Sequence, residues 1–137
     1  MSHSFHEVTM TYPMRGIRKS NLKLIHNLIP RIPFPIDQDF YVSPTFQDML
    51  NRTGDGKPLN WRKSLQKYYY REEWEVFAIK NHSEIEIPPP WRDAVRKDLE
   101  RDLLAWQRDT GDPWLCFPNG VLIGQKCLPL LNDLRDP

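Results

Sequence analysis

The chain of 137 residues lacks several features that would point to a partner. Its charges nearly cancel, with 19 Lys and Arg against 18 Asp and Glu, so it has no broad positive field for nucleic acid. No apolar run approaches the roughly 18 to 20 residues that cross a membrane. We therefore expect neither nucleic acid nor a membrane as a partner.

The sequence also lacks the local patterns of a self-contained active site. It has no glycine loop that would cradle a phosphate and no glycine-flanked nucleophilic serine. A metal site needs three or four clustered ligands, but the two cysteines do not have zinc-motif spacing. The histidines are scattered along the chain (His3, His6, His26, His82). We expect no metal and no cofactor bound by this chain.

A few features are typical of exported proteins. Asn51 and Asn81 each begin a glycosylation sequon, and Cys116 and Cys127 lie near the C-terminus. Sequons are common by chance, and the two cysteines could equally be buried free thiols. Residues 1–10 lack the apolar run of a secretory signal. Marks of export without a signal suggest an excised or truncated chain.

The first half of the chain favours extended structure. Residues 6–28 alternate between apolar and polar positions, and a turn at Ser20 and Asn21 predicts a β-hairpin over residues 15–27. Three prolines then remove backbone donors, which predicts an extended crossing loop over residues 29–39.

Two helices and one further strand follow. Ser43 and Pro44 form a helix start that Gly54 ends, and residues 74–77 have the composition of a strand. We predict a longer helix over residues 91–110, ended by Gly111 as a left-handed cap. Its predicted apolar stripe has four members (Val95, Leu99, Leu103, Trp106).

An amphipathic helix of this kind must cover a sheet. The sequence therefore predicts an α+β fold of one domain over residues 1–137, with a small antiparallel β-sheet packed against a long C-terminal helix. We expect the shorter helix to pack on the same sheet.

Three groups of residues are candidates for binding. His6 and Glu7, beside Ser4, could recognise a charged sugar, or they could simply be the polar start of a strand. The basic residues Arg15, Arg18, Lys19 and Lys23 could meet an acidic polysaccharide, but alternation favours a solvated side of the sheet. The aromatic residues Tyr68, Tyr69, Tyr70 and Trp74 could stack on sugars, although core and rim positions of the sheet explain them more simply.

Several segments resemble the C-terminal region of the sulfatase family, in particular its sulfamidase branch. These segments are His6 to Met10, Tyr12 to Arg15, Pro33 to Asp48, Leu50 to Thr53, Tyr68 to Arg71, Trp74-Glu75, Ala105 to Gln107 and Asp112 to Trp114. The resemblance runs nearly end to end, and the block over residues 33–53 is too long and particular to arise by chance. The chain departs from the family pattern after Phe77, so the resemblance makes no prediction for residues 78–90.

The resemblance implies a hydrolase that removes N-linked sulfate from the glucosamine of heparan sulfate, with a formylglycine nucleophile beside calcium. Both would belong to an N-terminal catalytic domain that this chain lacks. Cys116 does not match the nucleophile motif, because no arginine follows Pro118. The resemblance also implies a lysosomal or secretory location and a homodimer.

The resemblance bears on single residues as well. It implies a disulfide between Cys116 and Cys127, a glycan at Asn51 rather than at Asn81, and His6 and Glu7 near the sugar. Two other functions stay open at this point: a free-standing glycan-binding or regulatory domain without catalysis, and a gene-model fragment with no role of its own.

Overall fold

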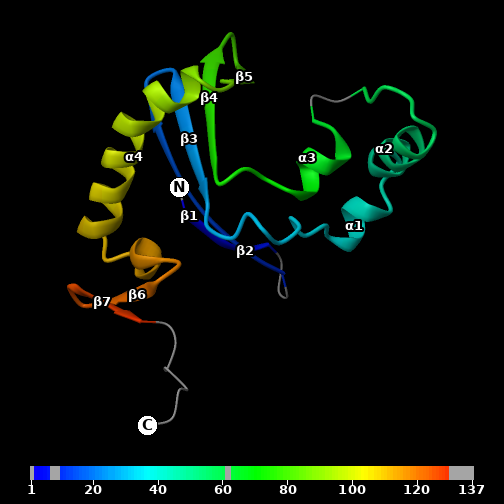
Figure 1. Ribbon diagram of the computed structural model, residues 1–137. Helices are drawn as coiled ribbons and strands as arrows, with labels where there is room; N and C mark the ends of the chain where they lie inside the picture. Colours follow the sequence, from blue (N-terminus) through cyan, green and yellow to red (C-terminus); the bar gives the residue numbers. More distant parts are fainter. Residues whose placement is uncertain (1, 7–9, 61–62, 130–137) are drawn as a thin grey trace, which may run out of the picture.

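The computed structural model describes residues 2–6, 10–60 and 63–129, with side chains from Tyr12 onward. It has an α+β fold, as predicted. A five-stranded antiparallel sheet has the order β1-β2-β3-β4-β5. The long helix α4 lies along one side of this sheet, and the short helices α1, α2 and α3 form a lobe on the other side (Figure 1). None of the described helices is long and apolar enough to cross a membrane.

Every strand of the sheet pairs with its neighbour in sequence. The strands are β1 (Ser2–His6), β2 (Met10–Lys19), β3 (Leu22–Asn27), β4 (Trp74–Lys80) and β5 (Ser83–Glu86). Ile17 lies opposite Leu24, and Leu24 lies opposite Val76, so these three side chains share one face. The turn between β2 and β3 places Ser20 at a φ of 53°, which confirms the predicted hairpin.

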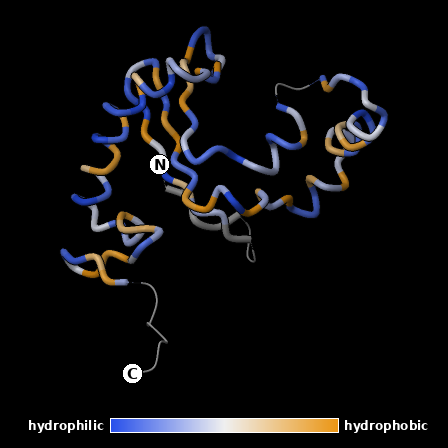
Figure 2. The backbone as a smooth tube through the Cα atoms, viewed as in Figure 1, coloured by the Kyte–Doolittle hydropathy of each residue, from blue (hydrophilic) through white to orange (hydrophobic). Residues whose placement is uncertain are grey.

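Helix α4 (Trp91–Asp109) covers the face that carries Leu24 and Val76. Leu99 and Leu103 from the helix are fully buried against those two residues. Apolar residues recur along α4 and concentrate in the strands beside it (Figure 2). Gly111, at a φ of 65°, follows the helix as predicted.

The predicted apolar stripe is wrong at its last member. Trp106 is 38% exposed, whereas Gln107 is 1% exposed. The buried face of the helix therefore continues four residues on, from Leu103 to Gln107. The polar Gln107 side chain can be buried there because its Nε2 atom donates a hydrogen bond to Asp112.

The lobe consists of α1 (Gln38–Tyr41), α2 (Pro44–Gly54) and α3 (Leu65–Tyr69). Ser43 begins α2 as predicted, since its hydroxyl oxygen accepts a hydrogen bond from the Phe46 N–H at 3.2 Å. The helix does not pack on the sheet, contrary to our expectation. It contacts α1 and α3 instead.

Two further observations concern residues 68–90. Tyr68 and Tyr69 belong to α3 in the lobe and not to a strand of the sheet. Residues 78–90, for which the resemblance made no prediction, contain the end of β4 and the whole of β5. The turn between them places Asn81 and His82 at φ values of 47° and 62°, an arrangement that closes a tight hairpin.

The C-terminal part is a small unit beyond α4. It contains the 3-10 helix η1 (Pro113–Cys116) and the hairpin of β6 (Gly120–Ile123) and β7 (Lys126–Pro129). Cys116 and Cys127 form a disulfide with a Cα–Cα distance of 5.7 Å, as predicted. A side chain at Gly120 would place its Cβ 2.5 Å from the Leu128 carbonyl oxygen, so the hairpin requires glycine there.

Candidate functional site

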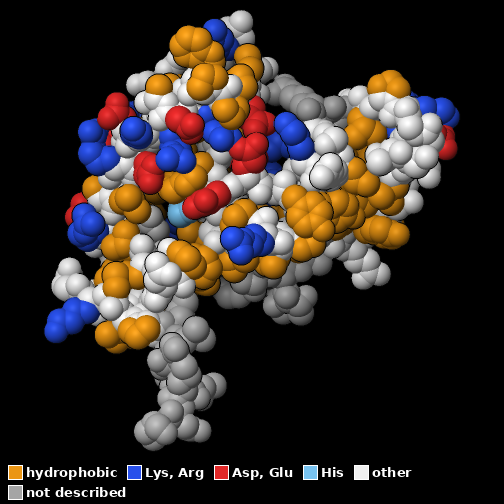
Figure 3. Space-filling view, in the orientation of Figure 1, with side chains coloured by type: hydrophobic (Ala, Val, Ile, Leu, Met, Phe, Trp, Pro, Cys, Tyr) orange, Lys and Arg blue, Asp and Glu red, His pale blue; other side chains and the backbone are white. Residues whose placement is uncertain are grey.

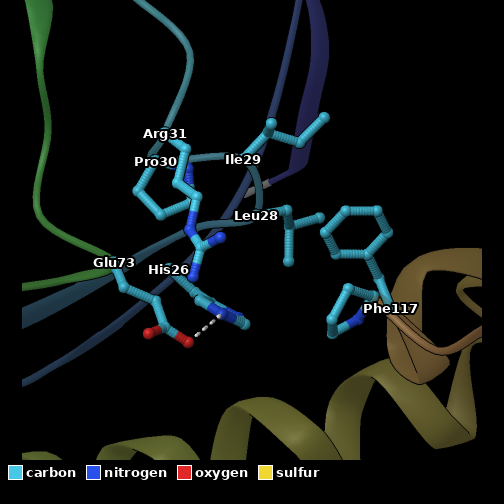
Figure 4. A pocket seen from close by; sticks show the side chains of 8 residues that line it. His26, Leu28, Ile29, Pro30, Arg31, Glu73 and Phe117 are labelled. Atoms are coloured by element: carbon cyan, nitrogen blue, oxygen red, sulfur yellow. Dashed lines mark ion pairs between the residues drawn. The ribbon is translucent and has the colours of Figure 1, made fainter.

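A pocket of about 420 Å³ lies where the end of β3 meets the C-terminal unit (Figure 4). Three separate segments line it. Its walls are mainly apolar, and its polar groups are one histidine, one carboxylate and one guanidinium (His26, Leu28, Ile29, Pro30, Arg31, Glu73, Phe117, Pro118). The pocket can therefore hold an apolar group beside a charged rim.

His26 forms the floor of this pocket. Its ring stacks on Trp74 with centroids 3.7 Å apart and an angle of 8° between the planes. Its Nε2 atom lies 3.7 Å from the Glu73 Oε1 atom, which is too long for a hydrogen bond. Burial lowers the pKa of His26 to about 4, although Glu73 opposes the shift. The imidazole is therefore neutral near pH 7, and its buried Nδ1 atom has no hydrogen-bond partner among the described residues.

The described lining of the pocket offers groups for binding. Among the described residues that line it, none is a serine, threonine or cysteine that could act as a nucleophile beside His26. Among residues 2–6, 10–60 and 63–129, no group of three or more His, Cys, Asp and Glu could hold a metal ion.

A buried ion pair lies close to this pocket. Arg15 is 4% exposed and forms a bidentate pair with Asp112, in which Nη2 donates to Oδ1 at 2.8 Å and Nε donates to Oδ2. Burial alone would raise the pKa of Asp112, but hydrogen bonds from Arg15, Gln107 and the Trp114 N–H outweigh it and hold the pKa below its usual value. Our expectation of a solvated basic side is therefore wrong for Arg15.

The other basic residues of that run behave differently. Arg18 and Lys19 are exposed, as expected for a solvated position. Lys19 pairs with Asp102 of α4 at 2.6 Å, and Lys23 pairs with Glu84 at 2.9 Å. Because Lys19 and Lys23 have acidic neighbours inside the chain, the run is not a continuous free basic surface.

A second polar cluster lies on the sheet face opposite α4. The buried Glu75 carboxylate accepts hydrogen bonds from Lys63 Nζ at 2.6 Å and from Asn27 Nδ2 at 3.0 Å. Arg71 lies 4.0 Å away and stacks over Phe34. Sequence analysis missed this cluster, although the alternation in β4 places Glu75 on the face opposite Val76.

Tyr12 lies beside the same cluster. Its ring is fully buried and contacts Phe34 edge-on, with the centroids 4.9 Å apart. Burial raises the pKa of Tyr12 to about 12, and its hydroxyl has no partner among the described residues. The cluster joins the sheet to the lobe, because Lys63 and Arg71 stand on either side of α3.

The predicted sugar-binding pair is only partly within the described structure. His6 is the last residue of β1 and pairs with Met10. It therefore ends the first strand, whereas we expected it to begin one. Glu7 lies outside the described residues. Their role stays a prediction.

The two sequons occupy different kinds of backbone. Asn51 is exposed in the last turns of α2, and Thr53 donates its hydroxyl to the Met49 carbonyl at 2.8 Å. Asn81 is exposed in the turn between β4 and β5. Both asparagines are accessible to solvent, and whether either carries a glycan stays a prediction.

Comparison with known proteins gives one clear result. The chain is 50% identical over 139 aligned residues to human N-sulphoglucosamine sulphohydrolase. The alignment covers 97% of this chain but only 28% of the human protein. No family model matches the chain. The match agrees with the resemblance found in the sequence motifs, and the chain spans 28% of the length of the human protein.

Proposed function

We propose that this chain is the C-terminal domain of a sulfamidase-like sulfatase, which in full-length form hydrolyses N-linked sulfate from the glucosamine of heparan sulfate. The 50% identity over 97% of the chain carries this proposal. The match covers 28% of the human protein, and the rest of such a protein would contain the N-terminal catalytic region, the main partner of this domain. Heparan sulfate would be the substrate of the assembled protein.

The chain by itself should not catalyse the reaction. Transition-state stabilisation by a sulfatase requires a formylglycine and calcium, which we assign to the catalytic region. Cys116 cannot supply the formylglycine here, because it is bonded to Cys127 and lacks the arginine of the motif. The described residues also lack a metal-binding cluster, so they do not fit the calcium ion.

A chimaera tests this function directly. In human N-sulphoglucosamine sulphohydrolase, the matching 28% is replaced by this chain, and release of sulfate from N-sulfoglucosamine is measured. We expect turnover by the chimaera and none by the chain alone. A folded chimaera without activity, or calcium-dependent turnover by the pure chain, would contradict the proposal.

The rival function is a free-standing glycan-binding domain. It predicts that the chain alone binds a heparan sulfate oligosaccharide, whereas a domain that depends on the catalytic region should not. Titration calorimetry with a defined oligosaccharide separates the two. Binding that is lost at higher salt would favour the rival function.

We extend the proposal to His6 and Glu7, which would approach the sugar in the full protein. The support is the polar character of both residues and the place of His6 at the end of the edge strand β1. In the chimaera, the double substitution His6→Ala and Glu7→Ala should raise KM or lower kcat. Unchanged kinetic constants would return the pair to a structural role.

The compartment and the assembly form part of the same proposal. A disulfide and two exposed sequons support a secretory or lysosomal location. Removal of glycans from protein made in a secretory cell should lower its mass, and Asn51→Gln and Asn81→Gln identify the sites. A homodimer is expected for the full-length protein, and sedimentation of the chimaera measures it.

A further inference from the structure

The α1–α3 lobe has a small aromatic interior. Rings from all three helices and the preceding loop meet there, with centroids 5.1 Å apart for Phe40 and Phe46 and 5.7 Å apart for Phe34 and Tyr68. Phe46 and Met49 are its buried members in α2. The three helices have only 4, 11 and 5 residues, lengths that are marginal without support from packing. The lobe therefore needs other surfaces to keep its order.

The outside of the lobe is also apolar. Four large side chains from the loop, α1 and the end of α3 remain 40%, 51%, 63% and 53% exposed (Ile32, Tyr41, Val42, Tyr70). Hydrophobic side chains gather over α1 and the segment that leads to it (Figure 3). We call these four residues the lobe band. Apolar surface of this kind is typical of an interaction site.

The charge pattern supports the same view. Between Ile29 and Phe46 the only charged residues are Arg31, Asp37 and Asp39. The Asp37 carboxylate is already engaged, because it caps α1 by accepting from the Phe40 N–H. Interface cores are poor in charge and rich in tyrosine, whereas solvated helix faces carry many charges, as α4 does.

Exposed apolar residues also occur away from the lobe, among them Ile123 and Leu128, which are 59% and 43% exposed in the hairpin of β6 and β7. Ile85 lies in β5 and Trp91 begins α4, each apart from the lobe. Single exposed apolar residues are normal on protein surfaces. Ile85 is 52% exposed, close to the value for Tyr41, and so provides a matched control.

We infer that the lobe band is the surface on which the N-terminal catalytic region of the same polypeptide packs. The inference rests on the proposed function. The relative that matches this chain is much longer, since the match covers 28% of it, so a large protein surface is available to cover the band. Packing there would complete the support that the three short helices lack.

Thiol labelling tests whether the catalytic region covers the lobe band. Both native cysteines are in the disulfide, so Val42→Cys or Ile85→Cys adds the one free thiol of the chain. The maleimide reaction is followed by mass spectrometry at the peptide that carries the new cysteine. In the chimaera with the human catalytic region, we expect Cys at position 42 to react about tenfold or more slowly than in the chain alone, since labelling then requires local opening. At position 85 the rates should agree within about twofold.

The outcomes separate the two proposals. Equal reaction at position 42 in the chimaera and in the chain alone overturns the inference, even where the chimaera is active. Protection at position 42 in an inactive chimaera supports the inference and counts against the proposed function. Protection that appears in the chain alone and grows with its concentration indicates a second copy, and overturns the inference.

A second measurement does not depend on the chimaera. An environment-sensitive dye that binds exposed apolar surface is added to the chain alone. The double substitution Tyr41→Ser and Val42→Ser should lower dye binding by about half, and Ile85→Ser should leave it nearly unchanged. Equal dye binding by the unsubstituted chain and both variants would overturn the inference that the lobe band is an interaction surface.

Discussion

The sheet with α4 and the α1–α3 lobe bury their apolar side chains differently. Under α4, Leu24, Val76, Leu99 and Leu103 form one core between a sheet face and a long helix. In the lobe, short helices share a few rings, and several large apolar side chains remain on the surface. The comparison indicates that the stability of the chain resides mainly in the sheet and α4, while the lobe leaves apolar surface exposed.

The largest effect on stability is expected from the buried ion pair. Arg15→Met leaves the Asp112 carboxylate buried without its guanidinium, and both side chains are at most 6% exposed. We expect the free energy of unfolding to fall by about 3 to 5 kcal/mol. Urea unfolding followed by circular dichroism measures it.

Lys19→Met is the matched control, because Lys19 lies on the same strand and pairs with Asp102 of α4, but its side chain is 59% exposed. Its loss should be at most about 1 kcal/mol. Equal losses for the two substitutions would show that burial gives the Arg15–Asp112 pair no larger effect on stability than the exposed pair has.

The next effect concerns the apolar core under α4. Leu103→Ala removes buried methyl groups from a residue that is fully inaccessible, and should cost about 3 kcal/mol. Trp106→Ala, at an exposed position on the same helix, should cost less than about 1 kcal/mol. Thermal and urea unfolding of both variants decide between the observed stripe and the one predicted from sequence. A larger loss at Trp106 would favour the latter.

The third effect is a dependence on pH through His26. Its folded pKa of about 4 lies below the ordinary value of 6.5, so the unfolded state takes up a proton first as the pH falls. Stability should therefore fall between pH 6.5 and 4, by an amount on the order of 1 to 3 kcal/mol. Denaturant unfolding at several pH values measures this slope.

His26→Phe keeps a ring to stack on Trp74 and should flatten the slope. His82→Asn changes an exposed turn residue with a positive φ and should leave the slope unchanged. If the pH dependence of stability persists in His26→Phe, other titrating groups must cause it.

The smallest effect on global stability is expected from the lobe. Phe46→Ala removes a fully buried ring, but the ring packs within the lobe and not under α4. Hydrogen exchange should speed up by about tenfold or more at α2 amides and change little at α4 amides. Faster exchange in both helices would mean that the two regions unfold together, against the comparison drawn above.

Much of the fold follows from short-range patterns. Apolar residues that recur three or four positions apart predict α4. Ser43 and Pro44 predict the start of α2, and the turn at Ser20 predicts the hairpin. These features depend on residues within one or two turns of each other, so local geometry decides them. Resemblance, and not local pattern, provided the disulfide between Cys116 and Cys127.

Only the tertiary structure decided where separate segments meet. Arg15 and Asp112 are 97 positions apart, so neither alternation in a strand nor helix periodicity could show that a basic residue would be buried against that aspartate. The pocket at His26 likewise combines the end of β3 and the loop after it, Glu73 just before β4, and the two residues that follow η1. The sequence by itself determined the elements and their faces, because those depend on neighbours in the chain. The partner of each face depended on how the elements pack, because burial and charge pairing act through space.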